Sequence, residues 1–355
     1  MKCSNLLSLV LMIFIIPLLS FASRDSSESD ADDDLASKEE KSYAPKIKGY
    51  LQFHYRGSVE TNHDGVVDHD NFRVLRVRLG VKGKIKPKIS YTIEFDPRAP
   101  TIDGVLRDAY ISIKKLIPHH QIRLGQQKTQ FGYENRESST RLYEVNRAFA
   151  SDNLARGVTL RDIGIGVLGK IDLSEDLRIE DALTVTNGSR MNSQDDYTSR
   201  KNYWGRIGIR KGDDSNWTRL GTSFGFGDIY DPFVLPAEPQ VAFDRYGIDY
   251  ETDSPNYFVS AEYIMGRDDI KGDQKVEVSG YYLNLVHKMK SNYGPLIRFD
   301  VTSKGGSETA RRWTGGFFWG ELDDECRFLF NYEYRERMDG ARADDKYYFW
   351  MQAKI

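Results

Sequence analysis

Residues Leu75 to Ile85 alternate between apolar and mostly basic positions with a period of two. Side chains of a β-strand point alternately to opposite faces, so this pattern predicts an amphipathic strand. One face would hold Leu75, Val77, Leu79, Val81, Gly83 and Ile85, and the other Arg76, Arg78, Gly80, Lys82 and Lys84. The apolar face suits either the core of a soluble sheet or the lipid of a membrane.

Similar segments recur along the chain, separated by turn-rich breaks and without useful helical periodicity. We predict sixteen strands, approximately at 46–56, 71–85, 87–96, 105–115, 120–127, 160–171, 177–187, 201–211, 216–228, 240–251, 256–266, 274–288, 293–303, 311–321, 325–335 and 344–355. The fold class is therefore all-β. An even count of strands of about this length, without a linker after residue 46, favours a transmembrane antiparallel β-barrel over a sandwich.

The N-terminal residues indicate export. The apolar run Leu6 to Leu19 follows Lys2 and precedes a small-residue cleavage site at Ala22, which predicts a signal peptide over 1–22. The run is short for a membrane anchor. Residues 23–45 form an acidic leader, whose segment 24–41 has a net charge of −5 and little apolar content, and which we expect to be disordered in the periplasm. The barrel would occupy 46–355.

Two further features fit a barrel in the outer membrane. The chain ends within its last predicted strand, as expected if that strand pairs with the first. Aromatic residues cluster near strand ends, where membrane barrels carry interfacial girdles. These clusters are Tyr281–Tyr282, Trp313, Trp319 and Tyr347–Tyr348.

One break is far longer than the others. Residues 128–159 separate the fifth and sixth predicted strands, and a loop of this length is usually functional. It contains Lys128, Arg136, Arg141, Arg147 and Arg156. In sixteen-stranded porins the corresponding loop folds into the lumen and narrows it.

An ordered set of short motifs resembles the phosphate-selective porin O and P family. The motifs are Arg76-Val-Arg78-Leu-Gly-Val-Lys-Gly, Asp108-Ala-Tyr-Ile, Leu124-Gly-Gln-Gln-Lys128-Thr-Gln-Phe-Gly-Tyr-Glu134 with Ser138-Ser139, and Ala155-Arg156-Gly157 leading to Arg161-Asp162-Ile-Gly164. The resemblance implies a homotrimeric sixteen-stranded channel in the outer membrane of a Gram-negative bacterium. It also implies passage of phosphate or polyphosphate. The C-terminal aromatic residue of the family is Ile355 here, and its arginine ladder has no position-by-position counterpart.

Basic side chains could form an anion path in such a lumen. Arginine presents a planar set of donors that matches phosphate oxygens and stays charged at physiological pH. The candidates are basic residues that the two-residue alternation places on the inward face, or that lie in the long loop or beside it. They are Arg76, Arg78, Lys82, Lys84, Arg123, Lys128, Arg136, Arg141, Arg147, Arg156, Arg161, Arg206 and Arg210, with Arg298 as a further inward position. A lumenal ion pair with a neighbouring carboxylate is the alternative role for each.

The sequence thus predicts an outer-membrane porin that passes small hydrophilic solutes, prefers anions and is not an enzyme. No metal-ligand spacing or nucleophile motif occurs, so we expect no cofactor and no metal. Expected partners are small anions such as phosphate, outer-membrane lipid, the barrel-assembly machinery and two further copies of the chain, but not nucleic acid. The alternatives are an outer-membrane barrel enzyme of the lipase or protease type and a secreted structural β-protein.

Overall fold

The structure is a computed structural model of the chain. It describes residues 43–355 except 60–69, 99–104, 157–160, 194, 197, 199, 231–239, 271–273, 290–291, 321, 323 and 338–344. The chain divides into two units, Met1–Tyr43 and Ala44–Ile355. The predicted signal peptide and nearly all of the acidic leader lie outside the described residues and stay predictions.

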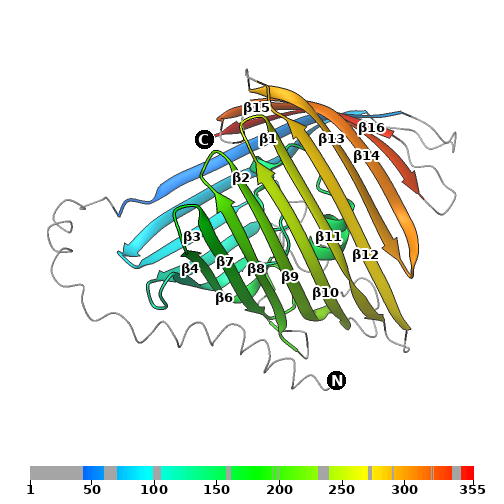
Figure 1. The fold of residues 1–355 in the computed structure, drawn as a ribbon. Helices are drawn as coiled ribbons and strands as arrows, with labels where there is room; N and C mark the ends of the chain where they lie inside the picture. The colour runs from blue at the N-terminus through cyan, green and yellow to red at the C-terminus, as the bar shows by residue number, and fades with distance from the viewer. Residues whose placement is uncertain are drawn as a thin grey trace. The chain divides into compact units, whose positions relative to one another are not determined.

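The second unit is a closed antiparallel barrel, in which each strand pairs with its neighbours in sequence and β1 pairs with β16 (Figure 1). The strands are β1 (Lys46–Val59), β2 (Asn71–Lys86), β3 (Ile89–Phe95), β4 (Leu106–Lys114), β5 (His120–Lys128), β6 (Arg161–Asp172), β7 (Leu177–Thr186), β8 (Asn202–Gly212), β9 (Trp217–Tyr230), β10 (Gln240–Asp253), β11 (Tyr257–Ile270), β12 (Gln274–His287), β13 (Tyr293–Lys304), β14 (Ser307–Trp319), β15 (Cys326–Arg337) and β16 (Asp345–Lys354). The predicted fold class and strand number are confirmed.

The closing seam of the barrel pairs β1 with β16. Leu51 of β1 lies opposite Ala353 of β16, and Phe53 lies opposite Met351. The backbone N–H groups of Gly49 and Ile355 each donate to the carbonyl of the other, at 3.2 and 2.9 Å. The seam therefore pairs the two strands up to the last residue and leaves no sheet edge open there.

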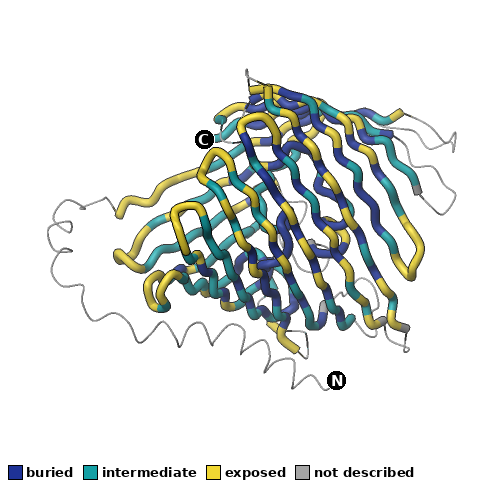
Figure 2. Tube along the Cα trace, in the orientation of Figure 1, coloured by how far each residue is buried: buried dark blue, intermediate teal, exposed yellow. Residues whose placement is uncertain are grey.

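The two faces of the barrel wall have opposite chemistry, as Figure 2 shows by the alternation of buried and exposed positions along many of the strands. In β15, Arg327, Asn331 and Glu333 point into the lumen and are fully buried, whereas Phe328 and Tyr332 lie on the exposed outer face. The same outer face carries leucine, isoleucine, phenylalanine and tyrosine from most strands. A continuous exposed apolar surface of this kind is untenable in water and suits lipid.

Some predicted girdle residues lie inside instead. Tyr281, Trp313 and Trp319 are exposed on the outer face, but Tyr282 and Tyr348 point inward and are buried. The reason is the period of two, because adjacent aromatic residues in a strand must face opposite sides.

A β-bulge changes the opening pattern of β2. Gln52 of β1 lies opposite Arg76, whereas its neighbour Phe53 lies opposite Val74, so Leu75 is an extra residue. Leu75 turns toward the lumen, where it lines a cavity and packs on a buried cluster. The prediction that Leu75 belongs to the outward apolar face was wrong, because a bulge shifts the alternation by one residue.

Only short helices accompany the strands among the described residues: η2 (Ser139–Arg141) and the π-helix η3 (Ala150–Arg156), both between β5 and β6. In the described part of the chain, none is long and apolar enough to cross a membrane.

Candidate functional site: a basic passage beside the inward loop

The segment between β5 and β6, described for residues 129–156 and here named the inward loop, folds into the lumen. Its Tyr133, Tyr143, Val145 and Ala148 pack against inward side chains of β11 to β16. Those wall residues are Phe258, Tyr282, Val286, Leu296, Phe318, Leu329, Tyr348 and Trp350. Apolar packing therefore holds the loop against one side of the barrel.

A second apolar cluster extends this contact around the wall. Phe131, Ala150, Leu154 and Ala155 of the loop pack with Trp204, Phe243, Ile264 and Val278 of β8, β10, β11 and β12. The ring of Phe131 meets that of Trp204 edge-on at 5.6 Å, and Trp204 stacks on Phe243 at 5.1 Å. The two clusters together fill the lumen along β8 and β10 to β16.

Polar wall residues bind the backbone of the loop between Val145 and Phe149. Asn331 accepts from the Val145 N–H at 2.8 Å, and Asp300 accepts from the Phe149 N–H at 2.9 Å. Arg298 donates to the Asn146 carbonyl at 2.8 Å, and Arg312 to the Arg147 carbonyl at 2.5 Å. We name this set, with Glu333, which accepts from Asn146 at 2.8 Å, the polar clamp. Because these contacts are buried, they fix the position of the loop.

The open part of the lumen lies on the opposite side, along β1 to β6. It contains a cavity of about 640 Å³. Its charged lining comprises ten basic residues, Arg76, Arg78, Lys82, Arg98, Arg107, Arg123, Lys128, Arg136, Arg147 and Arg161, and four acidic ones, Glu94, Asp96, Asp108 and Glu137. The lining has a formal net charge of +6, although the whole chain has −3.

Three arginines in this cavity are held by neutral oxygens. Arg76 donates to the side-chain oxygen of Gln52 at 2.8 Å, and Arg136 donates to the Gly132 carbonyl at 2.6 Å. Arg147 donates to the carbonyls of Glu134 and Glu137, the latter at 2.8 Å. Among the described residues, no carboxylate lies within ion-pair distance of these three, so their positive charge is not neutralised locally. We name them the unpaired arginines.

Burial lowers the pKa of Arg136 in the inward loop to about 10. The guanidinium therefore stays charged at neutral pH. Lys128 lies beside it and donates to the carbonyls of Arg136 and Glu137 at 3.1 and 2.8 Å. Neutral carbonyls thus position both side chains at the edge of the cavity, and the Arg136 charge is not cancelled there.

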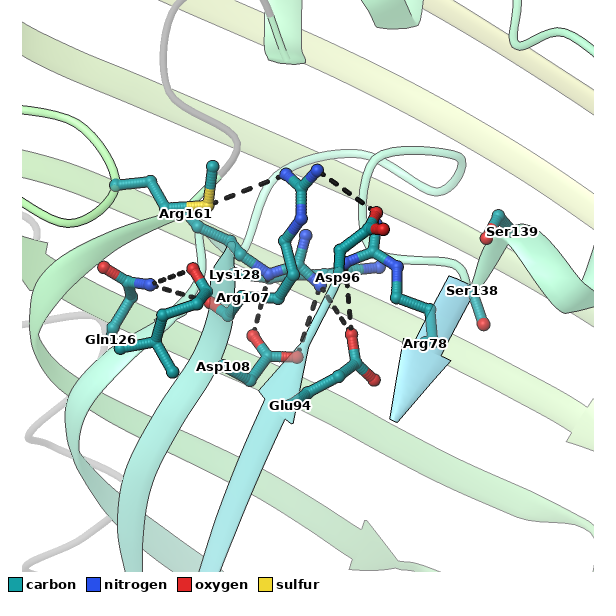
Figure 3. A network of polar contacts seen from close by, with 12 residues as sticks. Arg78, Glu94, Asp96, Arg107, Asp108, Gln126, Lys128, Ser138, Ser139 and Arg161 are labelled. Carbon is teal, nitrogen blue, oxygen red and sulfur yellow. Dashed lines mark hydrogen bonds and ion pairs between the residues drawn. The ribbon is translucent and has the colours of Figure 1, made fainter. Parts of the chain in front are cut away.

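Other arginines of the cavity alternate with carboxylates in a continuous row (Figure 3). Asp96 lies 3.4 Å from both Arg107 and Arg78, and Arg78 lies 3.6 Å from Glu94. The row ends at Arg161, which is 3.8 Å from Glu94 and binds Asp108 through two hydrogen bonds of 2.8 and 3.2 Å. We name Arg107, Asp96, Arg78, Glu94, Arg161 and Asp108 the ion-paired row.

The structure brings eight of the thirteen predicted anion-path residues into the cavity lining. These are Arg76, Arg78, Lys82, Arg123, Lys128, Arg136, Arg147 and Arg161. Arg123 stacks over the Tyr110 ring at 4.9 Å. Four others lie outside that lining, namely Lys84, Arg141, Arg206 and Arg210, and the side chain of Arg156 lies outside the described part of the structure.

The environments of those four side chains differ. Arg206 of β8 is buried and its Nε donates at 3.1 Å to Asp249 of β10, two strands along the same wall, and Arg210 donates to the Asp213 carbonyl in the β8–β9 turn at 2.6 Å. Lys84 is exposed near the end of β2, beside the short turn that leads to β3. Arg141 is paired with Glu137 at 3.7 Å. Arg156 ends η3.

The further inward position Arg298 also serves structure. Its buried guanidinium lies 3.6 and 3.8 Å from Glu134 and Glu144 of the loop, and 3.4 Å from Asp300. It therefore belongs to the polar clamp and does not line the cavity.

Two basic residues of the lining, Arg98 and Arg107, were missed in the sequence. Strict alternation in β4 turns Arg107 outward, since Asp108 faces inward. A bulge brings it inside: Glu94 lies opposite Asp108, whereas Phe95 lies opposite Leu106, so Arg107 is the extra residue. Arg98 follows β3 in a turn, where period-two reasoning does not apply.

The described residues contain no group of three or more histidine, cysteine, aspartate or glutamate side chains that could hold a metal ion. The predicted absence of a cofactor stays a prediction. What the site offers is a cavity with a positively charged lining beside an anchored loop.

Comparison with known proteins agrees with this geometry. Residues 47–201 match the family model of the phosphate-selective porin O and P. The predicted resemblance is thus confirmed over the part of the chain that forms β1 to β7 and the inward loop. No curated protein sequence matches the chain.

Solved porin structures share the whole fold at low sequence identity. The anion-selective porin from Comamonas acidovorans is 9% identical, with a TM-score of 0.59 over 88% of this chain and 99% of that one. A trimer form of OmpT, an outer membrane protein of Vibrio cholerae, is 10% identical, with a TM-score of 0.59 and the same coverage. The outer membrane channel DcaP of Acinetobacter baumannii is 12% identical, with a TM-score of 0.58 over 88% and 97%. At such identities these likenesses establish the porin fold.

The family match, the barrel and its apolar outer face support the predicted location in the outer membrane of a Gram-negative bacterium. They identify an outer-membrane channel of the porin type.

Proposed function

We propose that this porin passes small hydrophilic solutes by passive diffusion and prefers anions, with phosphate or polyphosphate as the leading substrates. The observation that carries the proposal is the net charge of +6 on the cavity lining, including three arginines held only by neutral oxygens. A narrow passage lined by one sign of charge raises the local concentration of the opposite ion. Several moderate sites along a wall also permit release, which transport requires.

The same geometry supports a channel over an enzyme, because its charged groups line a cavity inside a closed barrel, as in water-filled outer-membrane channels. The family of the match is named for phosphate selectivity, and one solved porin of the same fold is described as anion-selective. Both support the sign of the preferred ion.

Planar-bilayer recordings test the proposal. Under a salt gradient, the reversal potential of the wild-type channel should show anion over cation selectivity. Replacing both Arg76 and Arg136 by glutamine should reduce the permeability ratio about tenfold, because each charge contributes about 0.7 kcal/mol to an ion roughly 6 Å away in water. A cation-selective wild type would refute the proposed anion preference.

Lys84→Gln provides the matched control. It removes one positive charge from β2 at an exposed position outside the cavity lining. The permeability ratio of this variant should stay close to the wild-type value. An equal effect of Lys84→Gln would show that total charge, and not the cavity, sets the selectivity.

We further propose that the channel is a homotrimer inserted by the barrel-assembly machinery. A trimer form is known for one solved structure of the same fold. Light scattering of the detergent-purified protein should give three times the chain mass, and a monomeric mass would contradict the proposal.

A further inference from the structure

The ion-paired row does not bind all of its arginines equally. Asp108 holds Arg161 through two direct hydrogen bonds, but Asp96 reaches Arg78 and Arg107 only at 3.4 Å each. Figure 3 shows Asp96 between these two guanidiniums. Charge-assisted pairs with good geometry are shorter than this, so Asp96 is a weak partner for both.

The polar atoms around Asp96 retain unused hydrogen-bonding capacity. Oδ1 of Asp96, Nε and Nη1 of Arg78 and Nε of Arg107 are buried and have no hydrogen-bond partner among the described residues. Buried donors of this kind are costly unless another group satisfies them. An anion with several oxygens could meet both arginines at once, since phosphate accepts several hydrogen bonds.

The backbone holds the competing carboxylate at this place. Asp96 directly follows β3, and its N–H donates to the Val105 carbonyl at 2.7 Å. Its side chain is buried at the cavity wall. Asp96 therefore lies where it would compete with a permeating anion for Arg78 and Arg107.

We propose that Asp96 sets the phosphate affinity of the passage by occupying Arg78 and Arg107. This inference rests on the proposed anion-conducting function. With the Asp96 carboxylate present, a phosphate must displace it before the phosphate can bind the guanidiniums of Arg78 and Arg107. Phosphate is then bound weakly and released readily, and the passage admits anions in general. Without the carboxylate, Arg107 keeps no acidic partner among the residues that the structure describes, and Arg78 keeps only Glu94 among them.

The test measures block of chloride current by inorganic phosphate in planar bilayers. Asp96→Asn should lower the half-blocking phosphate concentration about tenfold relative to wild type, which corresponds to about 1.4 kcal/mol. Asp96→Glu restores the charge and should return the half-blocking concentration toward the wild-type value. An unchanged or higher half-blocking concentration in Asp96→Asn would overturn the proposal.

Glu137→Gln controls for charge. It raises the net charge of the lining by the same unit, but Glu137 is not part of the ion-paired row and pairs with Arg141 at 3.7 Å. It should increase anion selectivity without a comparable gain in phosphate block. An equal gain would assign the effect to net charge and overturn the role of Asp96.

Two readouts separate the possible failures. Cation selectivity of the wild type would refute the proposed function, whereas anion selectivity with no shift in Asp96→Asn would refute only the role of Asp96. Heat-modifiable gel mobility establishes that each variant forms the barrel. Asp96→Ser removes the same charge with a smaller side chain and decides the question if the asparagine variant does not fold.

Discussion

Replacement of Arg312 by methionine would remove the centre of the polar clamp. The guanidinium binds Asp300 at 2.9 and 3.2 Å, Glu333 at 3.2 Å and the Arg147 carbonyl at 2.5 Å. It also lies over the Phe149 ring, at 4.2 Å from the centroid. One side chain thus joins three strands of the wall to the inward loop.

The size of the effect follows from what the substitution leaves behind. Removing one partner of a buried ion pair costs about 3–5 kcal/mol, because the other charge stays buried. Here Asp300 retains Arg298 at 3.4 Å, and Glu333 retains Asn146 and Arg335. We therefore expect Arg312→Met to lose folding free energy at the lower end of this range, about 3 kcal/mol. The lost hydrogen bond to the Arg147 carbonyl should add about 1 kcal/mol.

Two measurements check this expectation. The temperature at which the barrel changes its gel mobility should fall, and single-channel recordings should show increased open-channel noise as the loop moves. The control is Arg311→Met, since neighbouring Arg311 faces outward and pairs with Glu308 and Glu336 at the exposed surface, where ion pairs contribute little. If Arg312→Met matched the control in both measurements, the polar clamp would not be what holds the loop.

Two further predictions concern the inward loop. Burial raises the pKa of Glu144 to about 7, so the folded state retains a proton that the unfolded state loses near pH 4.5. Stability should therefore fall between pH 4.5 and 7, by up to about 1.4 kcal/mol per pH unit, and Glu144→Gln should flatten that dependence in heat-denaturation curves; an unaltered slope would contradict this. Gly280→Val should displace η3, because a Cβ at Gly280 would lie 2.9 Å from that of Ala150. The overpacking should cost about 1–3 kcal/mol of folding free energy and so lower the temperature of heat denaturation. Gly315→Ala is the control and should leave that temperature unchanged, because a Cβ at Gly315 meets no atom within 4 Å.

The strands were predictable because alternate residues differ in polarity, with polar side chains facing the lumen and apolar side chains facing the lipid. Predicted and observed bounds of β8 differ by one residue at each end, and β12 ends one residue earlier than predicted. Both strands have clear two-residue alternation between turn-rich breaks. Periodicity fails where a bulge inserts one residue, as at Leu75 and Arg107. No local residue pattern marks these bulges, because they depend on the register of the neighbouring strand.

The site was harder to predict. The position of a residue in a strand predicts which face of the wall its side chain lies on, but not which residue it pairs with. Arg76 and Arg206 both face inward, yet Arg76 binds a neutral amide whereas Arg206 meets Asp249. The difference comes from β10, which lies two strands away from Arg206 and contributes the carboxylate. Ion pairing across several strands is a property of the closed barrel, and single-strand patterns do not contain it.

The position of the inward loop decides which arginines can act on an ion. Against β8 and β10 to β16, the loop buries the lumenal arginines in contact with carboxylates or backbone carbonyls, and these groups stabilise the loop. Along β1 to β6 it leaves a cavity whose basic lining exceeds its acidic lining by six charges. The acidity of the whole chain belongs to the leader, and residues 42–355 have a formal net charge of only +1, so the charge of the barrel as a whole would give almost no preference for either sign of ion. The proposed anion selectivity therefore depends less on how many arginines the chain has than on the side of the loop on which they lie. For the same reason, variants that release the loop should lose selectivity even when every residue of the passage is retained.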